Sequence, residues 1–188
     1  MEGRRWRRRS GAELNMDWSP PTLRSERLVI RPFRVEDMDF VHRYAREHDS
    51  SAYGSWLGGT SPGDVARYLA DTIARYRRPP RCDLGVSLDG QLIGGVAFRQ
   101  VWIAPLALEL GWVLHPTVAG KGLAREAVST LCAHLEGMGD VVRLEGRVRT
   151  ADARGARLLG DLGFGLEGTM DYGVAGTVGL FGRVLVRT

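Results

Sequence analysis

The fold of this chain is decided by residues 115–127, which read His115-Pro116-Thr117-Val118-Ala119-Gly120-Lys121-Gly122-Leu123-Ala124-Arg125-Glu126-Ala127. This stretch joins an apolar run that ends at Leu114 to a stretch with the apolar spacing of a helix. Small residues at Gly120, Gly122 and Ala124 let the backbone come close to an anion. The helix that follows begins with N–H groups that have no partner in the helix and with the positive end of its dipole. The stretch therefore predicts a turn that can bind a phosphate.

Two better-known phosphate motifs do not match this turn. A Walker loop has four residues between its glycines and a Ser or Thr after the lysine, and Gly120-Lys121-Gly122 has neither. The dinucleotide pattern GxGxxG is not formed here either. Taken alone, the glycines fit an ordinary turn before a buried helix equally well.

The elements around this turn form one series of strands and helices without an internal repeat. Ser61, Pro62 and Asp64 form the start signal of a helix, and Asp89-Gly90 is typical of a tight hairpin. Apolar and charged residues alternate along 142–149, as in a strand with one buried face. We predict, in chain order, strand 26–33, helix 36–48, helix 61–76, strands 83–88, 91–101 and 106–114, helix 122–136, strand 142–148, helix 152–161, and strands 165–175 and 178–186.

The composition is that of an ordinary globular domain. The chain has 188 residues, of which 44% are hydrophobic and 26% charged, and this is enough for a single core. No apolar run reaches the roughly 18 residues of a membrane-spanning helix, so no membrane partner is expected. Cys82 and Cys132 form neither a disulfide framework nor a CxxC pair, and the histidines lack metal-ligand spacing. We therefore expect a cytoplasmic protein without a metal site.

The net charge of +4 is concentrated near the N-terminus. Residues 1–15 carry five arginines against two glutamates, so the rest of the chain carries only +1. We interpret residues 1–22 as a basic, disordered tail; alternatively, translation starts at Met16 and the first 15 residues are an annotation error. One domain then spans 23–188, and its nearly neutral charge argues against a nucleic-acid partner.

Four stretches, in chain order, resemble those of a known family. They are residues 25–32 (SERLVIRP), residues 109–116 (ELGWVLHP), the glycine turn followed by Arg125-Glu126-Ala127, and residues 157–168 (RLLGDLGFGLEG). With them the chain from Leu23 to Val186 resembles the GNAT superfamily of acyl-CoA-dependent N-acetyltransferases, in particular the Rim-type ribosomal-protein acetyltransferases. The resemblance implies an α+β fold in α/β/α layers, with a mixed, mostly antiparallel sheet, a splayed pair of parallel strands and helices on both faces.

The resemblance also implies how acetyl-CoA, or another acyl-CoA, is bound as co-substrate. Its pyrophosphate is expected on the turn and helix start formed by Ala119, Gly120, Lys121, Gly122, Leu123 and Ala124. Its pantetheine arm is expected to pair, like an added strand, with the backbone groups of Trp112, Val113, Leu114 and His115. A backbone N–H near Val113 would polarise the thioester carbonyl. Asp152 stands where relatives commonly have Asn and is a further candidate contact to the CoA arm.

Glu109 is the predicted catalytic base. It matches the position at which Rim-type relatives carry a glutamate proposed to accept the proton of the attacking amine, directly or through water. Two alternatives stay open. In the first, Glu109 has no catalytic role and is only the solvent-facing residue between Leu108 and Leu110 in an alternating strand. In the second, His115 is the base, although a histidine before a proline at a strand end is more often structural.

Several positions depart from the family pattern. Ala119 replaces the usual Gln or Arg, Gly155 stands where relatives commonly have Ser, and Leu159 occupies the usual place of a tyrosine general acid. Tyr172 is a candidate substitute for that acid. Cys132 lies on the apolar face of its helix, which favours a core role over a nucleophilic one. Four arginines are candidates for contacts with the phosphates of CoA, or simply for a solvated face: Arg147, Arg149, Arg154 and Arg157.

We therefore expect an N-acetyltransferase that moves an acetyl group from acetyl-CoA to a primary amine by direct attack in a ternary complex. The amine belongs to a protein N-terminus or to a small molecule, and the sequence leaves this open. The alternative is a binding module of the same fold that keeps CoA but has lost turnover, which the departures at Asp152, Gly155 and Leu159 favour. A homodimer is compatible with both interpretations.

Overall fold

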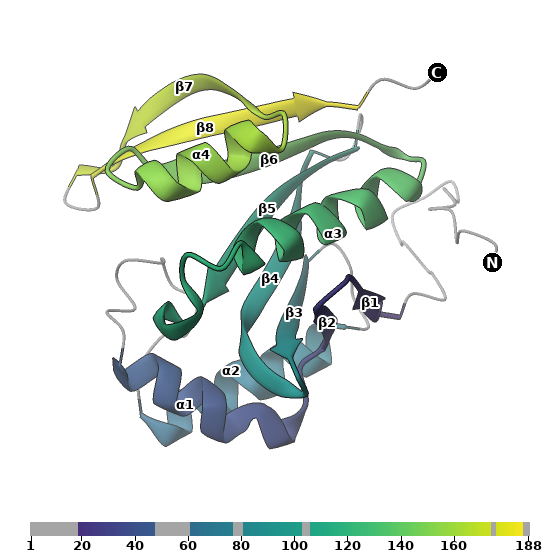
Figure 1. Cartoon of the computed structure of the whole chain (residues 1–188), viewed down its shortest axis with the longest axis vertical. Coiled ribbons are helices and arrows are strands. Elements are labelled where there is room, and N and C mark those ends of the chain that lie inside the picture. Colours follow the sequence, from purple (N-terminus) through teal and green to yellow (C-terminus); the bar gives the residue numbers. More distant parts are fainter. Residues whose placement is uncertain (1–18, 48–60, 77–80, 103–105, 174–175, 186–188) are drawn as a thin grey trace.

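A mixed sheet of eight strands forms the centre of the structure (Figure 1). The computed structural model describes residues 19–47, 61–76, 81–102, 106–173 and 176–185. The spatial order of the strands is β1-β2-β3-β4-β5-β6-β8-β7, and only the pair β5·β6 is parallel. The strands are β1 Leu23–Arg24, β2 Leu28–Pro32, β3 Arg81–Leu88, β4 Gln91–Trp102, β5 Leu106–Leu114, β6 Val141–Arg149, β7 Gly165–Asp171 and β8 Thr177–Val184.

Within the described residues, four α-helices and two short 3₁₀ turns accompany the sheet. Ser61 caps α2 as its sequence predicts, because its side chain accepts from the Asp64 N–H while the Asp64 carboxylate accepts from the Ser61 N–H. Among the described residues, no helix has both the length and the apolarity to cross a membrane. The helical elements are η1 Val35–Asp37, α1 Met38–Glu47, α2 Pro62–Arg75, η3 Pro116–Val118, α3 Leu123–Gly137 and α4 Ala153–Asp161.

Apolar side chains form two buried clusters, one on each face of the sheet. The larger cluster joins the sheet to α3 and α4, and it includes Leu131 of α3 and Leu159 of α4. The smaller cluster joins the other face to α1 and α2, and it includes Val65 of α2 and Val113 of β5. In Figure 1, α3 accordingly lies on one side of the strands, and α1 and α2 lie on the other. Helices thus cover both faces, and the predicted fold class is confirmed.

The parallel pair separates part of the way along its length. β5 pairs with β6 from Leu106 to Leu110, where the last partner is Gly146. Beyond this point β5 continues to Leu114 beside β4 only, while β6 continues beside β8. The predicted splay therefore begins between Leu110 and Gly111, and the β6-facing edge of residues 111–114 has no strand partner.

The structure also corrects several element boundaries. The two-residue strand β1 was not predicted, because two residues show no periodicity. The predicted helix 36–48 is a 3₁₀ turn followed by α1, and the buried Asp37 carboxylate ties this turn to the Arg34 N–H and the Arg31 guanidinium. The predicted strand 165–175 ends at Asp171, since Gly173 adopts φ 62° and accepts from the Gly176 N–H in a turn. The predicted loop 50–60 and most of the predicted tail lie outside the described residues.

Candidate functional site

The turn before α3 is open to a ligand. Gly120 and Gly122 have φ values of 77° and 75°, which residues with a side chain rarely adopt. No heavy atom lies within 4 Å of the place where a Cβ of Gly120 would stand. Gly122 is the N-cap of the 15-residue helix α3 and provides no side-chain cap for its first N–H groups. The turn can therefore hold an anion against the start of α3, as its sequence predicts.

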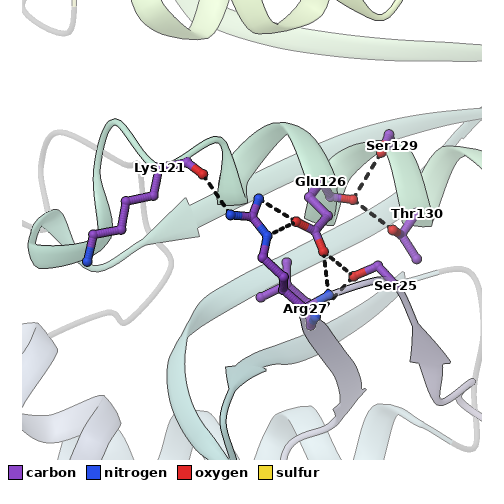
Figure 2. A network of polar contacts seen from close by, with 7 residues as sticks. Ser25, Arg27, Lys121, Glu126, Ser129 and Thr130 are labelled. Carbon is purple, nitrogen blue, oxygen red and sulfur yellow. Dashed lines mark hydrogen bonds and ion pairs between the residues drawn. The ribbon is translucent and has the colours of Figure 1, made fainter.

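A network of polar contacts fixes this turn to the N-terminal strands (Figure 2). Glu126, in the first turn of α3, accepts from the Ser25 hydroxyl at 2.7 Å and from the Arg27 N–H at 2.9 Å. The Arg27 guanidinium forms an ion pair with Glu126 at 2.6 Å and also donates to the Lys121 carbonyl at 3.1 Å. The Lys121 side chain points away from the network (Figure 2). The contacts thus hold the Lys121 carbonyl on the Arg27 side of the turn.

Glu126 is held as a carboxylate by this network. Burial acts to raise its pKa, but the hydrogen bonds from Ser25 and Arg27 outweigh burial, so its pKa lies below the ordinary value. The Ser129 and Thr130 hydroxyls donate to the backbone carbonyl of Glu126 at 3.0 and 2.7 Å. The sequence did not predict this network, although Ser25 and Arg27 lie in one stretch that resembles the family and Glu126 lies in another. A Ser25–Glu126 contact spans 101 residues, and one sequence gives no signal for it.

The unpaired edge of β5 lies beyond the separation of the strands. Trp112 is half-buried against the larger cluster, and Val113 is buried in the smaller one, so the two side chains fix this segment from opposite faces. Leu114 pairs with Gly94, where a Cβ would lie 2.2 Å from the Val113 carbonyl oxygen; only glycine allows this approach of the two strands. The predicted strand-like binding surface therefore has an anchored backbone and one free edge.

His115 and Ala119 use their backbone N–H groups within the protein. The His115 N–H donates to the Ile93 carbonyl at 2.7 Å, and its carbonyl accepts from Val118. Its imidazole accepts from the Thr117 N–H and lies 6.0 Å, between ring centroids, from Tyr44. The Ala119 N–H donates to Pro116 at 2.9 Å. The structure thus gives His115 a capping role at the strand end, the role that its sequence favoured over that of a base.

Glu109 lies where β5 and β6 begin to separate, on the face that carries α1 and α2. Strand alternation places it opposite Leu108 and Leu110, which belong to the larger cluster. Its side chain is 14% exposed, and its carboxylate contacts two guanidinium groups. Arg99 donates to Oε2 at 2.8 Å and to Oε1 at 3.3 Å, and Arg147 lies 3.4 Å from Oε2. Oε1 therefore keeps the greater capacity to accept a further proton donor.

Neither arginine partner of Glu109 was predicted. Arg147 was a candidate for a phosphate contact, and the structure places it beside Glu109 instead. Arg99 had one overlooked signal, because Arg99 and Glu109 are oppositely charged residues that face each other in the antiparallel pair β4·β5. The other arginine candidates, Arg149, Arg154 and Arg157, are exposed.

The start of α4 explains two of the departures from the family pattern. Asp152 caps this helix by accepting from the Gly155 N–H at 3.0 Å, and the residue is exposed. Gly155 is buried, and a Cβ there would lie 2.6 Å from Asp152 Oδ2 and 2.8 Å from Val148 Cγ1. A serine side chain does not fit at this position unless its neighbours move. The cap uses Oδ1 of Asp152, and its Oδ2 takes no part in it.

The residues considered for acid or covalent roles are placed as follows. Leu159 is fully buried and fills the space above Gly146, so this helix position faces the core. Tyr172 follows β7 and is 45% exposed. Cys82 and Cys132 are free and buried, and burial raises the pKa of Cys132 to about 12, which disfavours the nucleophilic thiolate. Within the part of the chain that the structure describes, no group of three or more His, Cys, Asp or Glu side chains is arranged to hold a metal ion.

Comparisons with known proteins agree with this fold. Residues 27–165 match the family model described as an acetyltransferase (GNAT) domain. The chain is similar to an uncharacterized N-acetyltransferase p20 of Bacillus licheniformis, with 26% identity over 155 residues that cover 80% of this chain and 86% of the relative.

Solved structures show the same architecture. A RimL ribosomal L7/L12 alpha-N-protein acetyltransferase in complex with coenzyme A superposes with a TM-score of 0.77 and 18% identity, covering 86% of this chain and 96% of its own. RimJ of Mycobacterium smegmatis in complex with a CoA disulfide gives a TM-score of 0.75 and 18% identity, covering 84% and 81%. The structures agree in fold, and the family model spans most of the chain. The chain therefore belongs to the GNAT acetyltransferase family and is an acyl-CoA-dependent acyltransferase.

Proposed function

We propose that this enzyme transfers the acetyl group of acetyl-CoA to a primary amine, on a protein N-terminus or a small molecule, by direct attack in a ternary complex. The observation that carries the proposal is the open turn at Gly120 and Gly122 in line with the free edge of β5. Together they offer N–H groups to a pyrophosphate and a strand edge to an extended amide chain.

The proposed binding residues follow from this geometry. The N–H groups of Gly120, Lys121, Gly122, Leu123 and Ala124 surround the pyrophosphate, and the buried Leu123 side chain anchors the helix start. Backbone groups of Trp112 and Leu114 pair with the pantetheine amides, and Val113 lies between them with its carbonyl toward β4. His115 and Ala119 contribute to the shape of the turn, because their own N–H groups already have partners. Asp152 contacts the CoA arm through the oxygen that the α4 cap leaves free.

In the proposed reaction the amine lone pair attacks the thioester carbonyl and the carbon–sulfur bond breaks. A backbone N–H near Val113 stabilises the developing oxyanion. Glu109 accepts the proton that the amine must lose, through Oε1 directly or through a water molecule, and the CoA thiolate takes up a proton on leaving. The position of Glu109 supports this role, because it immediately precedes the last residue of β5 paired to β6.

A catalytically inactive CoA-binding module is the second candidate. It is favoured by the two ion pairs that engage Glu109 and by Leu159, which fills the helix position where a general acid is expected. Both candidates require CoA binding, and only the enzyme requires turnover.

Two measurements test the proposal. Acetyl-CoA at about 100 times its dissociation constant should stabilise the protein against unfolding by roughly 2.7 kcal/mol. Release of CoA thiol should then be followed over a panel of peptides and small amines, because turnover separates the enzyme from the module. If acetyl-CoA produces no thermal shift, both candidates are wrong. A shift without thiol release from any amine favours the module.

A further inference from the structure

One carboxylate lies between two guanidinium groups at the centre of the sheet. Glu109 of β5 contacts Arg99 of β4 at 2.8 Å and Arg147 of β6 at 3.4 Å. The three side chains lie on the same face of three adjacent strands, at the point where β5 and β6 separate. In these contacts two guanidinium groups face one carboxylate, an excess of one positive charge. The neighbouring carboxylate of Glu145, which is in register with Glu109, is paired with Arg143 instead.

The other ion pairs of the described residues lack this excess. Arg31 pairs with Asp37, Arg81 with Asp83, and Arg27 with Glu126, each one to one. Arg143 lies between Glu145 and Glu167, so there two carboxylates face one guanidinium. Among the ion pairs joining described residues, guanidinium groups outnumber carboxylates only around Glu109.

Both arginines also keep hydrogen-bond donors that Glu109 does not use. A guanidinium has five N–H groups; two of Arg99 donate to Glu109, and one nitrogen of Arg147 approaches it. The Arg99 side chain is 49% exposed and the Arg147 side chain 35%, whereas Glu109 is 14% exposed. The carboxylate is thus covered while the guanidinium groups remain accessible. This arrangement suits a second anion, which two guanidinium groups can bind with charge-assisted hydrogen bonds.

We propose that Arg99 and Arg147 bind an anionic group of the acceptor, so that the enzyme prefers amines that carry a carboxylate close to the reacting nitrogen. This inference rests on the proposed function, because it places the amine at Glu109. The amine of the acceptor lies at Glu109 Oε1 in this proposal. One or two residues further along an extended acceptor chain lie within roughly 7 Å of that amine, and they carry the carboxylate. The acidic group then contacts the donors of Arg99 and Arg147 that Glu109 does not use.

The two sources of such an acceptor are an acidic peptide N-terminus and a free acidic amino acid. Binding is measured first, with CoA-saturated protein and two peptides of equal length that carry Glu or Gln at positions two and three and a fluorophore at the C-terminus. Free glutamate and glutamine form the second arm. Thiol release from acetyl-CoA is then measured with the same four acceptors.

We expect the acidic member of one arm to bind, and to give kcat/KM, at least about tenfold better than its amide partner. The arm that shows the difference identifies the source. Arg147→Gln and Arg99→Gln should each reduce the difference severalfold, and added salt should weaken it. Arg24→Gln removes the same charge from an exposed arginine at the far edge of the sheet and should retain the preference.

Equal binding of the acidic and amide members in both arms overturns the inference, whether or not the amines are acetylated. A preference that survives in the double variant Arg99→Gln/Arg147→Gln overturns it as well. The proposed function fails separately, through the absence of a CoA shift or of thiol release, because peptide binding can also be measured on protein without CoA.

Discussion

The carboxylates of Glu109 and Glu126 have similar exposure and opposite surroundings. Their side chains are 14% and 15% exposed, and arginine contacts both. Around Glu126 the partners are a hydroxyl, a backbone N–H and one guanidinium, which together tie α3 to the N-terminal strands. Around Glu109 they are two guanidinium groups with donors to spare. A glutamate is thus a structural link where protein atoms complete its contacts, and a candidate site where its arginine partners keep unused donors.

The comparison is tested most strongly by changing each carboxylate to its amide. Glu109→Gln should lower kcat by roughly 100-fold or more with the affinity for acetyl-CoA retained, because a proton acceptor typically contributes this much. Glu126→Gln should mainly raise KM for acetyl-CoA, since its network holds the turn that binds the pyrophosphate. Steady-state kinetics of thiol release measures both.

The alternative roles of Glu109 predict a different pattern. If Glu109 only orients Arg99 and Arg147, the amide variant should lose preference for acidic acceptors while kcat on neutral ones stays near that of the unmodified enzyme. An unchanged kcat would remove Glu109 from the role of base. If Glu109→Gln also lost affinity for acetyl-CoA, Glu109 would contribute to cofactor binding as well, and the roles of Glu109 and Glu126 would not be distinct.

The next largest effect is expected at the turn itself. Gly122→Trp should weaken acetyl-CoA binding by about 100-fold or more, because a side chain there occupies the space in front of α3 and strains a residue with φ 75°. Gly139→Trp is the control, since Gly139 has φ 76° and lies beyond the other end of α3. A Cβ there has no heavy atom within 4 Å, and a Cβ at Gly122 has only the Arg27 guanidinium at 3.7 Å. Thermal shift with acetyl-CoA compares the two. Equal loss of the shift in both variants would contradict the assignment of the turn.

The sequence was sufficient to predict the α-helices and the strands from β2 to β8, because each has its own period or start signal. The apolar spacing of α3 and the capping residues Ser61 and Asp64 are local, and the structure confirms both elements. The turn at 120–124 was predicted in the same way, since the spacing of its glycines is a local feature of the sequence. Strand β1 was missed because two residues are too short to show a period.

The contacts inside the site were less predictable, because they join distant parts of the chain. Arg27 and Glu126 are 99 residues apart, and their pairing depends on how the sheet brings β2 beside α3. Arg147 reaches Glu109 only through the parallel register of β5 and β6. Gly155 looked like a loss of function in sequence, whereas in the structure it fits where a Cβ would overlap Val148.

A smaller effect is expected from the Arg27–Glu126 pair. Arg27→Gln should raise KM for acetyl-CoA by up to about tenfold, because the Lys121 carbonyl loses its donor. A double-mutant cycle with Glu126→Gln should give a coupling in unfolding free energy of about 1 kcal/mol, limited by the 44% exposure of Arg27. The more exposed pair Arg67–Asp64, at 3.5 Å, is the control and should show a clearly weaker coupling. Equal coupling in the two pairs would reduce Glu126 to an ordinary surface contact.

The smallest effect concerns the acid dependence of stability. The pKa of Glu126 in the folded protein lies below the ordinary value of 4.5, so its contribution is present above about pH 4.5 and is lost as the pH falls through the folded pKa. Urea unfolding between pH 6 and pH 3 should therefore show a steeper loss of stability for the unmodified protein than for Glu126→Gln, by less than about 1 kcal/mol. Other carboxylates with lowered pKa values, such as Asp37, contribute equally to both proteins and cancel in the difference. If the unfolding free energies of the two proteins fall in parallel with pH, the Glu126 carboxylate is not stabilised by its network on folding. The contrast with Glu109 would then rest on geometry alone.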